Sequence, residues 1–375
     1  MSKVLFRYFY LLILLGLLSG CGWKATLDAA DGTPVTVTRA TLRDLKDFAD
    51  EEGRVPVERM LYQNGYRLIE TLHVTDAEGG VRALDWAASA ETLLWLESGK
   101  LLLGDETLAA THLAVSPAPE LAEVAVSLTD IAPTAAAALG IPVPAQATGR
   151  ALTAAPAQHV VLIFLDGFGY LRYLSARDVG LVPHLSALGE PQMGLSVYPP
   201  CTAVGSAAVL TGAPPEVNGV VQRGIRTTES ETLPDVAVAA GLRVVAVEGD
   251  ALAFNMRNAD LTLSGDRDGN GSTDDNVRAN ALAALAEGLP DVLWVHFHGI
   301  DDVGHTYGPD TPEDSAAIAG VDAVVGDLLA ALPSETLVII FADHGMHAVQ
   351  EEGRLGNHGN LIARDMLVPV WVVQQ

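Results

Sequence analysis

The fold of most of this chain is decided by the stretch HVVLIFLDGFG at residues 159–169. Its apolar part, residues 160–165, is rich in β-branched side chains and is typical of a strand that is buried on both faces. Such strands belong to mainly parallel sheets, whose binding sites form at the carboxyl ends of the strands. We therefore expect Asp166, which follows the run directly, to lie at the edge of a functional site.

Similar apolar runs recur towards the end of the chain, and helical patterns separate them. In the pattern at 313–332, Ile318, Val321 and Val325 fall on one face of a helix. Buried strands that alternate with helices predict an α/β fold in which helices sandwich a mainly parallel sheet. The other runs lie at 243–247, 292–297, 337–341 and 368–373, and the other helical pattern lies at 276–289.

The residues before this pattern indicate a different kind of domain. A length of 375 residues is typical of two domains. Residues 21–117 show only short, mixed patterns, among them a helix expected at 41–51. We interpret residues 21–117 as a small accessory α+β domain and residues 121–375 as the main domain. A ligand-binding module is the alternative, because Trp86 and Trp95 could line a pocket as readily as fill a core.

The N-terminal residues resemble a bacterial lipoprotein signal. Lys3 and Arg7 precede an apolar run at 8–18 that is too short to span a bilayer comfortably, and Leu-Ser-Gly-Cys follows at 18–21. The resemblance implies that residues 1–20 are removed, that Cys21 carries lipid, and that the protein is exported and anchored to the bacterial cell envelope by that lipid. A plain N-terminal anchor helix is the alternative.

Charge and cysteine content exclude two classes of protein. Lys and Arg number 22 against 47 Asp and Glu, which gives a formal net charge of −25. Binding to nucleic acid through a basic surface is therefore excluded. The two cysteines are too few for a disulfide framework.

Carboxylates and histidines follow three of the expected strands and occupy one later loop. A set of imidazoles and carboxylates without thiolates is typical of a site for zinc or a similar divalent ion. One such element alone indicates no more than a capped turn, but four in this order predict a metal site. The candidate ligands are Asp166 after the first strand, Asp301 and His305 after the strand at 292–297, Asp343 and His344 after the strand at 337–341, and His358 in the loop.

Thr202 is the candidate nucleophile. It follows Tyr-Pro-Pro-Cys at 198–201 and stands at the start of an expected helix, where free N–H groups and the helix dipole favour an anion. A metal ion in contact with its hydroxyl would lower the pKa of that hydroxyl and activate it. The alternative is that Thr202 only caps the helix.

The order and spacing of these residues resemble the alkaline phosphatase superfamily, and in particular its nucleotide pyrophosphatase/phosphodiesterase-like branch, over residues 160–373. The resemblance implies an alkaline phosphatase-like fold, a Thr or Ser nucleophile and two zinc ions. Asp301 is preferred to Asp302 because the branch has the pattern Asp-x-x-Gly-His. The implied ligands of one ion are Asp166, Thr202, Asp343 and His344, and those of the other are Asp301, His305 and His358.

The sequence departs from that branch next to the nucleophile. Ala-Val-Gly at 203–205 stands where the branch often has Phe-Pro-Asn, and Arg223 stands near the place of an asparagine that helps to bind the phosphoryl group. Arg223 could make a bidentate phosphate contact instead, or only a surface ion pair. Cys201 lacks the Cys-x-Pro-x-Arg pattern of sulfatases, so we interpret it as a small buried residue.

Residues 121–152 resemble the segment that normally ends the catalytic domain of this superfamily. Asp130, Pro133 and Gly140 frame an alanine-rich helix there. Because the segment precedes the first strand of the pattern, we expect a circularly permuted domain in which this helix packs against the sheet. A coincidental alanine-rich helix is the alternative.

The stretch DRDGNGSTD at 266–274 resembles a calcium loop. Its candidate ligands for a structural calcium ion are Asp266, Asp268, Asn270 and Asp274, but the loop lacks the final glutamate of the pattern. An acidic, glycine-rich turn is the alternative.

Together these features predict an exported, metal-dependent phosphoester hydrolase, phosphodiesterase- or nucleotide pyrophosphatase-like, that acts on a small phosphoester. A phosphomonoesterase of the same superfamily and a non-catalytic envelope lipoprotein are the alternatives. No pattern in the sequence identifies the leaving group.

Overall fold

The computed structural model describes residues 23–375, so the expected signal at 1–20 and Cys21 lie outside the described residues. The chain divides into two compact units between Pro117 and Ala118. Within the described part, no helix combines the length and the apolar character needed to cross a membrane.

The first unit, of which residues 23–117 are described, is built mainly from short strands. Its strands are β1 (Lys24–Asp28), β2 (Pro34–Thr38), β3 (Val55–Pro56), β4 (Ile69–Thr75), β5 (Val81–Asp85), β6 (Leu93–Trp95), β7 (Lys100–Leu103), β8 (Glu106–Ala109) and β9 (His112–Pro117). Its helices are α2 (Arg39–Asp44), the 3₁₀ helix η1 (Lys46–Phe48), α3 (Val57–Gln63) and α4 (Trp86–Ser89).

Two sheets organise this first unit. One has the strand order β2-β1-β9-β4-β5, and the other, which is antiparallel, has the order β3-β6-β7-β8. Trp86 and Trp95 are both fully buried, so they fill the core and do not line an open pocket. The single helix expected at 41–51 was wrong, because α2 ends at Asp44 and only η1 follows it.

The second unit, residues 118–375, holds the remaining elements. Its strands are β10 (Val126–Ser127), β11 (His159–Leu165), β12 (Gln192–Leu195), β13 (Val244–Glu248), β14 (Asp260–Leu263), β15 (Val292–Phe297), β16 (Thr336–Phe341), β17 (His347–Glu351), β18 (Arg354–Asn357) and β19 (Leu367–Gln374). Its helices are η2 (Pro119–Glu123), η3 (Leu128–Asp130), α5 (Ile131–Leu139), α6 (Tyr170–Asp178), α7 (Pro183–Ala187), α8 (Thr202–Thr211), α9 (Pro215–Asn218), α10 (Leu233–Ala239), α11 (Asp274–Gly288), α12 (Gly299–Tyr307), α13 (Pro312–Ala331) and α14 (Ala363–Met366).

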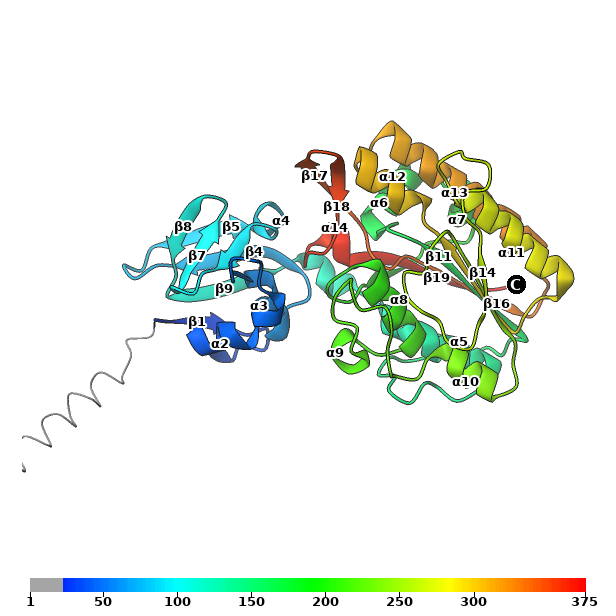
Figure 1. The fold of residues 1–375 in the computed structure, drawn as a ribbon, viewed down its shortest axis with the longest axis horizontal. Helices are drawn as coiled ribbons and strands as arrows, with labels where there is room; N and C mark the ends of the chain where they lie inside the picture. Colours follow the sequence, from blue (N-terminus) through cyan, green and yellow to red (C-terminus); the bar gives the residue numbers. More distant parts are fainter. Residues whose placement is uncertain (1–22) are drawn as a thin grey trace, which may run out of the picture. The chain divides into compact units, whose positions relative to one another are not determined.

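An eight-stranded sheet forms the centre of the second unit, in the order β10-β12-β19-β16-β11-β15-β13-β14 (Figure 1). Neighbouring strands are parallel except at β19, which is antiparallel to both β12 and β16. The predicted α/β fold with a mainly parallel sheet is therefore confirmed. All five apolar runs of the sequence are strands of this sheet.

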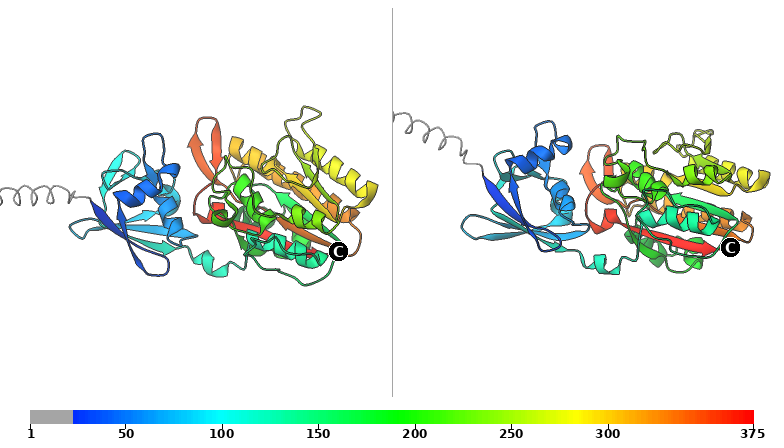
Figure 2. Two further views of the ribbon diagram at one scale, coloured as in Figure 1. Left: turned by 60° about the horizontal axis from the view of Figure 1, so that its bottom comes forward. Right: turned by 90° about the horizontal axis from the view of Figure 1, so that it is seen from below.

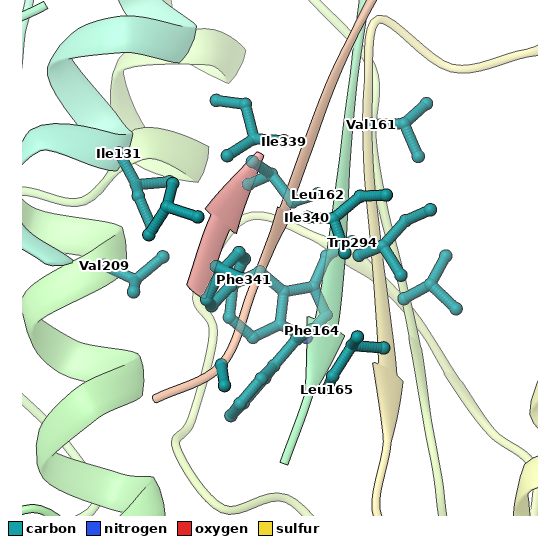
Figure 3. Close-up of a cluster of buried hydrophobic side chains, with 14 of the residues drawn as sticks. Ile131, Val161, Leu162, Phe164, Leu165, Val209, Trp294, Ile339, Ile340 and Phe341 are labelled. Carbon is teal, nitrogen blue, oxygen red and sulfur yellow. The ribbon is translucent and has the colours of Figure 1, made fainter. Parts of the chain in front are cut away.

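Helices cover both faces of the sheet, as Figures 1 and 2 show. The helices α5, α8 and α10 pack together on one face, and α6, α7, α11, α12 and α13 lie on the other. In Figure 3, Ile131 of α5 and Val209 of α8 face Ile339 and Phe341 of β16, and all four side chains are buried in one core. Because helices cover both faces of the sheet, each central strand is buried on both sides, and this is why its sequence is a continuous apolar run.

Residues 126–152, which precede the first central strand, belong to this core. The strand β10 pairs with β12, and Ile131 and Ala135 of α5 are completely buried in the core. The hydroxyl of Thr134 accepts the N–H of Leu152 at 2.9 Å, which ties the rest of the segment to α5. The segment thus packs against the sheet, and its origin by circular permutation stays a prediction.

Candidate active site

The candidate ligands gather at the carboxyl ends of three adjacent strands. Asp166 follows β11 and Asp343 follows β16, while α12, which begins soon after β15, carries Asp301 and His305. Because β11 lies between β16 and β15 and is parallel to both, these side chains reach the same edge of the sheet.

The first predicted ligand set is brought together around His344. Its Nε2 lies 3.4 Å from Asp166 Oδ1 and 3.3 Å from Asp343 Oδ2. Thr202 Oγ1 lies 3.5 Å both from Asp166 Oδ1 and from His344 Nε2. Atoms bound at about 2.0–2.1 Å to a tetrahedral zinc ion are roughly 3.3 Å apart. These four separations therefore match those between ligand atoms of a tetrahedral divalent ion, and the ligand atoms of Asp166, Asp343 and His344 all lie within 4.8 Å of one another.

The second predicted ligand set lies beside the first. Asp301 Oδ2 is 3.2 Å from His305 Nε2, its partner one turn along α12, and Asp301 Oδ1 is 3.9 Å from His358 Nε2. Asp302 is exposed, so Asp301 is the carboxylate that faces the histidines. The rings of His344 and His358 stack with their centroids 3.7 Å apart. The two sets therefore adjoin each other.

Backbone carbonyl groups orient the three candidate ligand histidines. A carbonyl oxygen can only accept a hydrogen bond, so each bonded Nδ1 carries the proton and each Nε2 carries the lone pair that a metal ion requires. Burial, together with the positive charge of Arg223, lowers the pKa of His358 well below its usual value and keeps this ring neutral. The three bonds, each of 2.8 Å, run from His305 to Gly356, from His344 to Gly345 and from His358 to Pro200.

The charge balance of the site fits bound cations. Among the described residues, the buried oxygens Asp301 Oδ1 and Asp343 Oδ2 have no hydrogen-bond partner. Burial and the negative charges of Asp166 and Asp301 raise the pKa of Asp343 well above its usual value. Buried carboxylates that repel one another need positive charge between them. The residues present therefore fit divalent metal ions.

Thr202 does not occupy the N-cap position of its helix. It is the first residue of α8, and the N-cap position belongs to Cys201, whose side chain makes no cap hydrogen bond. Burial raises the pKa of the Cys201 thiol to about 11, so this neighbour stays protonated and is a poor nucleophile. Gly205 follows one turn later, and a Cβ there would meet Asp343 Cβ at 2.7 Å. The close approach of α8 to Asp343 explains the glycine that departs from the family pattern.

Arg223 reaches the site. Its Nη2 lies 2.9 Å from His358 Nε2, although most of the side chain is exposed. A guanidinium group therefore stands beside the candidate ligands, where it can meet an anionic substrate.

The four candidate calcium ligands are not brought together. Three of them stay in the exposed loop at 266–271, where Asp266 accepts the backbone N–H groups of Gly269 and Gly271. The carboxylate of Asp274 instead accepts the N–H groups of His298 and Gly299, each at 3.0 Å. Calcium binding by this loop stays a prediction.

Sequence reasoning missed three side chains that pack behind Asp166. His296 Nε2 lies 3.1 Å from Asp166 Oδ2, and its Nδ1 lies 2.7 Å from Glu248 Oε2. His298 Nδ1 lies 3.5 Å from Asp166 Oδ2. The available signal was a polar residue at the carboxyl end of the runs at 243–247 and 292–297.

Several curated relatives are transferases of much greater length. The human GPI ethanolamine phosphate transferase 3, catalytic subunit, is 30% identical over 101 residues, which cover 27% of this chain and 8% of that protein. The Schizosaccharomyces pombe GPI ethanolamine phosphate transferase 3 is 39% identical over 86 residues, which cover 23% of this chain and 9% of that protein. The alignments thus span less than a tenth of the length of these two relatives.

Similar solved structures come from two kinds of hydrolase. Phosphonoacetate hydrolase from Sinorhizobium meliloti aligns with a TM-score of 0.40 and 19% identity over 56% of this chain and 59% of that chain. Human ectonucleotide pyrophosphatase/phosphodiesterase 5 aligns with a TM-score of 0.42 and 19% identity over 52% of this chain and 59% of that chain.

The family profile described as type I phosphodiesterase/nucleotide pyrophosphatase matches residues 160–238 and 248–369. These residues make up more than half of the chain and include Thr202 and all the candidate metal ligands. The chain therefore belongs to the type I phosphodiesterase/nucleotide pyrophosphatase family, the branch that its sequence resembles.

Proposed function

We propose that this chain is a metal-dependent phosphoester hydrolase that acts on small phosphodiesters through a covalent phosphoryl-threonine at Thr202. The observation that carries the proposal is the position of Thr202 Oγ1, which lies at the start of α8 and 3.5 Å from both Asp166 Oδ1 and His344 Nε2. A hydroxyl in that position faces the ligand cluster and the positive end of a helix at once.

Two divalent ions fit the two ligand sets, and imidazole with carboxylate ligands favours zinc. Bound there, the ions would supply Lewis acidity, which lowers the pKa of the Thr202 hydroxyl and stabilises charge on the phosphoryl oxygens. The residues that would hold one ion are Asp166, Thr202, Asp343 and His344, and those that would hold the other are Asp301, His305 and His358.

Side chains and backbone groups of the site would orient the nucleophile, stabilise charge and bind the substrate. Asp166 Oδ1 accepts the Thr202 hydroxyl at 3.5 Å and orients its oxygen towards phosphorus. The N–H groups at the start of α8 stabilise the negative charge that develops on the phosphoryl oxygens. Arg223, held beside His358, binds a phosphoryl oxygen of the substrate. Attack by Thr202 Oγ1 breaks the bond between phosphorus and the oxygen of the leaving alcohol, and the resulting phosphoryl-threonine keeps the other ester group of the diester. Water then hydrolyses this intermediate, which releases a phosphate monoester and restores the hydroxyl.

Loss of a single ligand should remove metal and activity together. In Asp343→Ala and His358→Ala, we expect a lower metal content by elemental mass spectrometry and a matching loss of turnover of an aryl phosphate diester. His159→Ala is the control. This partly buried histidine is the first residue of β11, at the end of the strand opposite to Asp166, and its ring bonds to the Pro290 carbonyl oxygen. Full turnover with an unchanged metal content in either ligand variant would contradict the assignment.

We also propose that the protein is exported and attached to the membrane through lipid on Cys21. The proposal is supported by the basic residues, the short apolar run and the Leu-Ser-Gly-Cys sequence at 18–21. In a bacterial host, the protein should sediment with membranes, and Cys21→Ala should shift it to the soluble fraction or leave the signal uncut. An unmodified cysteine in the mass spectrum of the wild-type protein would contradict the lipid anchor.

A further inference from the structure

The rear face of Asp166 carries a polar cluster that the proposed reaction does not use. Glu248 is the last residue of β13, His296 belongs to β15, and His298 follows this strand. The strands β13 and β15 are parallel neighbours, and β15 is also the neighbour of β11. The cluster therefore extends the row of candidate ligands along the same edge of the sheet, one and two strands beyond Asp166.

The two oxygens of Asp166 face in different directions. Oδ1 faces Thr202 and His344, as described above. Oδ2 lies 3.1 Å from His296 Nε2 and 3.5 Å from His298 Nδ1, and the three atoms all lie within 4.8 Å of one another. These separations again match the roughly 3.3 Å between ligand atoms of a tetrahedral zinc ion.

Glu248 orients the two rings. Its Oε2 lies 2.7 Å from His296 Nδ1 and 3.5 Å from His298 Nε2, and its Oε1 accepts the indole N–H of Trp294 at 2.8 Å. The indole N–H of Trp294 and the rings of His296 and His298 all face this carboxylate, which therefore accepts hydrogen bonds. His296 Nδ1 therefore carries the proton, and its Nε2 directs a lone pair at Asp166. Carboxylates orient metal-binding histidines in the same way.

We propose that Asp166 Oδ2, His296 Nε2 and His298 Nδ1 bind a third divalent cation of the zinc class, with the Asp166 carboxylate as a bridge to the site that holds Thr202. The proposal rests on the proposed function only because Asp166 is shared. Two imidazole nitrogens and one carboxylate oxygen favour zinc-class ions over magnesium and calcium. The side chain of His298 is 19% exposed, so the cluster has a path to solvent.

The packing of the two rings favours a cation over protons alone. Their centroids are 3.7 Å apart, and His296 is completely buried. Without a cation, the two nitrogen lone pairs and Asp166 Oδ2 would face one another. Protons on both rings would let them pair with Asp166 and Glu248 but would place two tilted positive rings in contact, whereas one divalent ion satisfies all three acceptors.

The test is the number of zinc ions that the protein retains. Wild-type protein, His298→Asn and the control His159→Asn are incubated with excess Zn²⁺, desalted and measured by elemental mass spectrometry, together with thermal unfolding and turnover of an aryl phosphate diester. We expect three zinc ions per chain in the wild type and the control, and two in His298→Asn. A second variant, Glu248→Gln, keeps the ligands but weakens their orientation, so we expect a roughly tenfold or greater loss of affinity for the third ion alone.

The outcomes separate this inference from the proposed function. Two ions in an active wild type, or three in folded His298→Asn, would overturn the third site and leave the two-ion assignment standing. Fewer than two ions in the wild type would overturn that assignment. Unaltered zinc affinity in Glu248→Gln would also count against the third site, because a purely structural glutamate would change stability and not affinity for one ion.

Discussion

Thr202→Ala is expected to lower turnover of an aryl phosphate diester by roughly a thousandfold or more, the scale seen when a hydrolase loses its nucleophile. The covalent route needs the Thr202 oxygen, and Cys201 beside it stays protonated. The variant should still bind metal through Asp166, Asp343 and His344. It should also keep its fold, because the N-cap of α8 is Cys201. Turnover and metal content measured on the same preparation check both halves of the expectation.

Thr202→Ser is the matched control. It keeps the oxygen at the start of α8 and should retain substantial turnover. If Thr202 served only the structure, Thr202→Ala would lower the thermal midpoint slightly and leave turnover near that of the wild type. Near-normal turnover in Thr202→Ala would therefore remove the phosphoryl-threonine from the mechanism.

Asp314→Ala is expected to cause the largest loss of stability. Asp314 pairs with Arg172, and their side chains are only 3% and 2% exposed. Arg172 also donates to the carbonyl oxygens of Gly167 at 2.6 Å and of Ile300 at 3.3 Å. Removing the carboxylate would leave a buried, uncompensated charge and cost about 3–5 kcal/mol. For a domain of this size the thermal midpoint should fall by roughly 6–20 °C.

Asp327→Ala provides the matched control on the same helix. Asp327 of α13 pairs with Arg278 at 2.7 Å, but both side chains are largely exposed. Such a pair contributes about 0–1 kcal/mol, so the midpoint should change little. Equal changes in the thermal midpoint of the two variants would contradict a stabilising role for the buried pair of Arg172 and Asp314. Because Arg172 holds the chain next to Asp166 and next to Asp301, the metal content of Asp314→Ala should fall as well.

The central strands were predictable because burial on both faces leaves a continuous apolar run. The run at 160–165 corresponds to β11 almost residue for residue. The helix expected at 41–51 failed for a local reason. Asp50 Oδ1 accepts the backbone N–H groups of Glu52 and Arg54, which favours a loop over another helical turn. Hydrophobic spacing carries no sign of such side-chain bonds to the backbone.

The residue types of the candidate site were predictable, but the contacts that orient them were not. Asp166 and Asp343 come just after apolar runs that the sequence identifies as buried strands. His296 was hidden because it lies inside an apolar run, and its role depends on Glu248 from another strand. The ion pair between Arg172 and Asp314 joins residues that are 142 positions apart in the sequence. Spacing along one chain cannot reveal such pairings, since they depend on how the elements pack.

The antiparallel strand β19 has a consequence for how this domain is made. In the sheet, β12 bonds to β10 on one side and to β19 on the other, and β19 in turn bonds to β16. During synthesis β12 leaves the ribosome well before β19. The edge of β12 that pairs with β19 therefore stays unpaired while about 170 further residues are synthesised. Until residues 367–374 emerge, the sheet exists as two separate parts. Exposed strand edges of this kind favour association between nascent chains, so assembly of this domain depends on the element that is translated after all its neighbours.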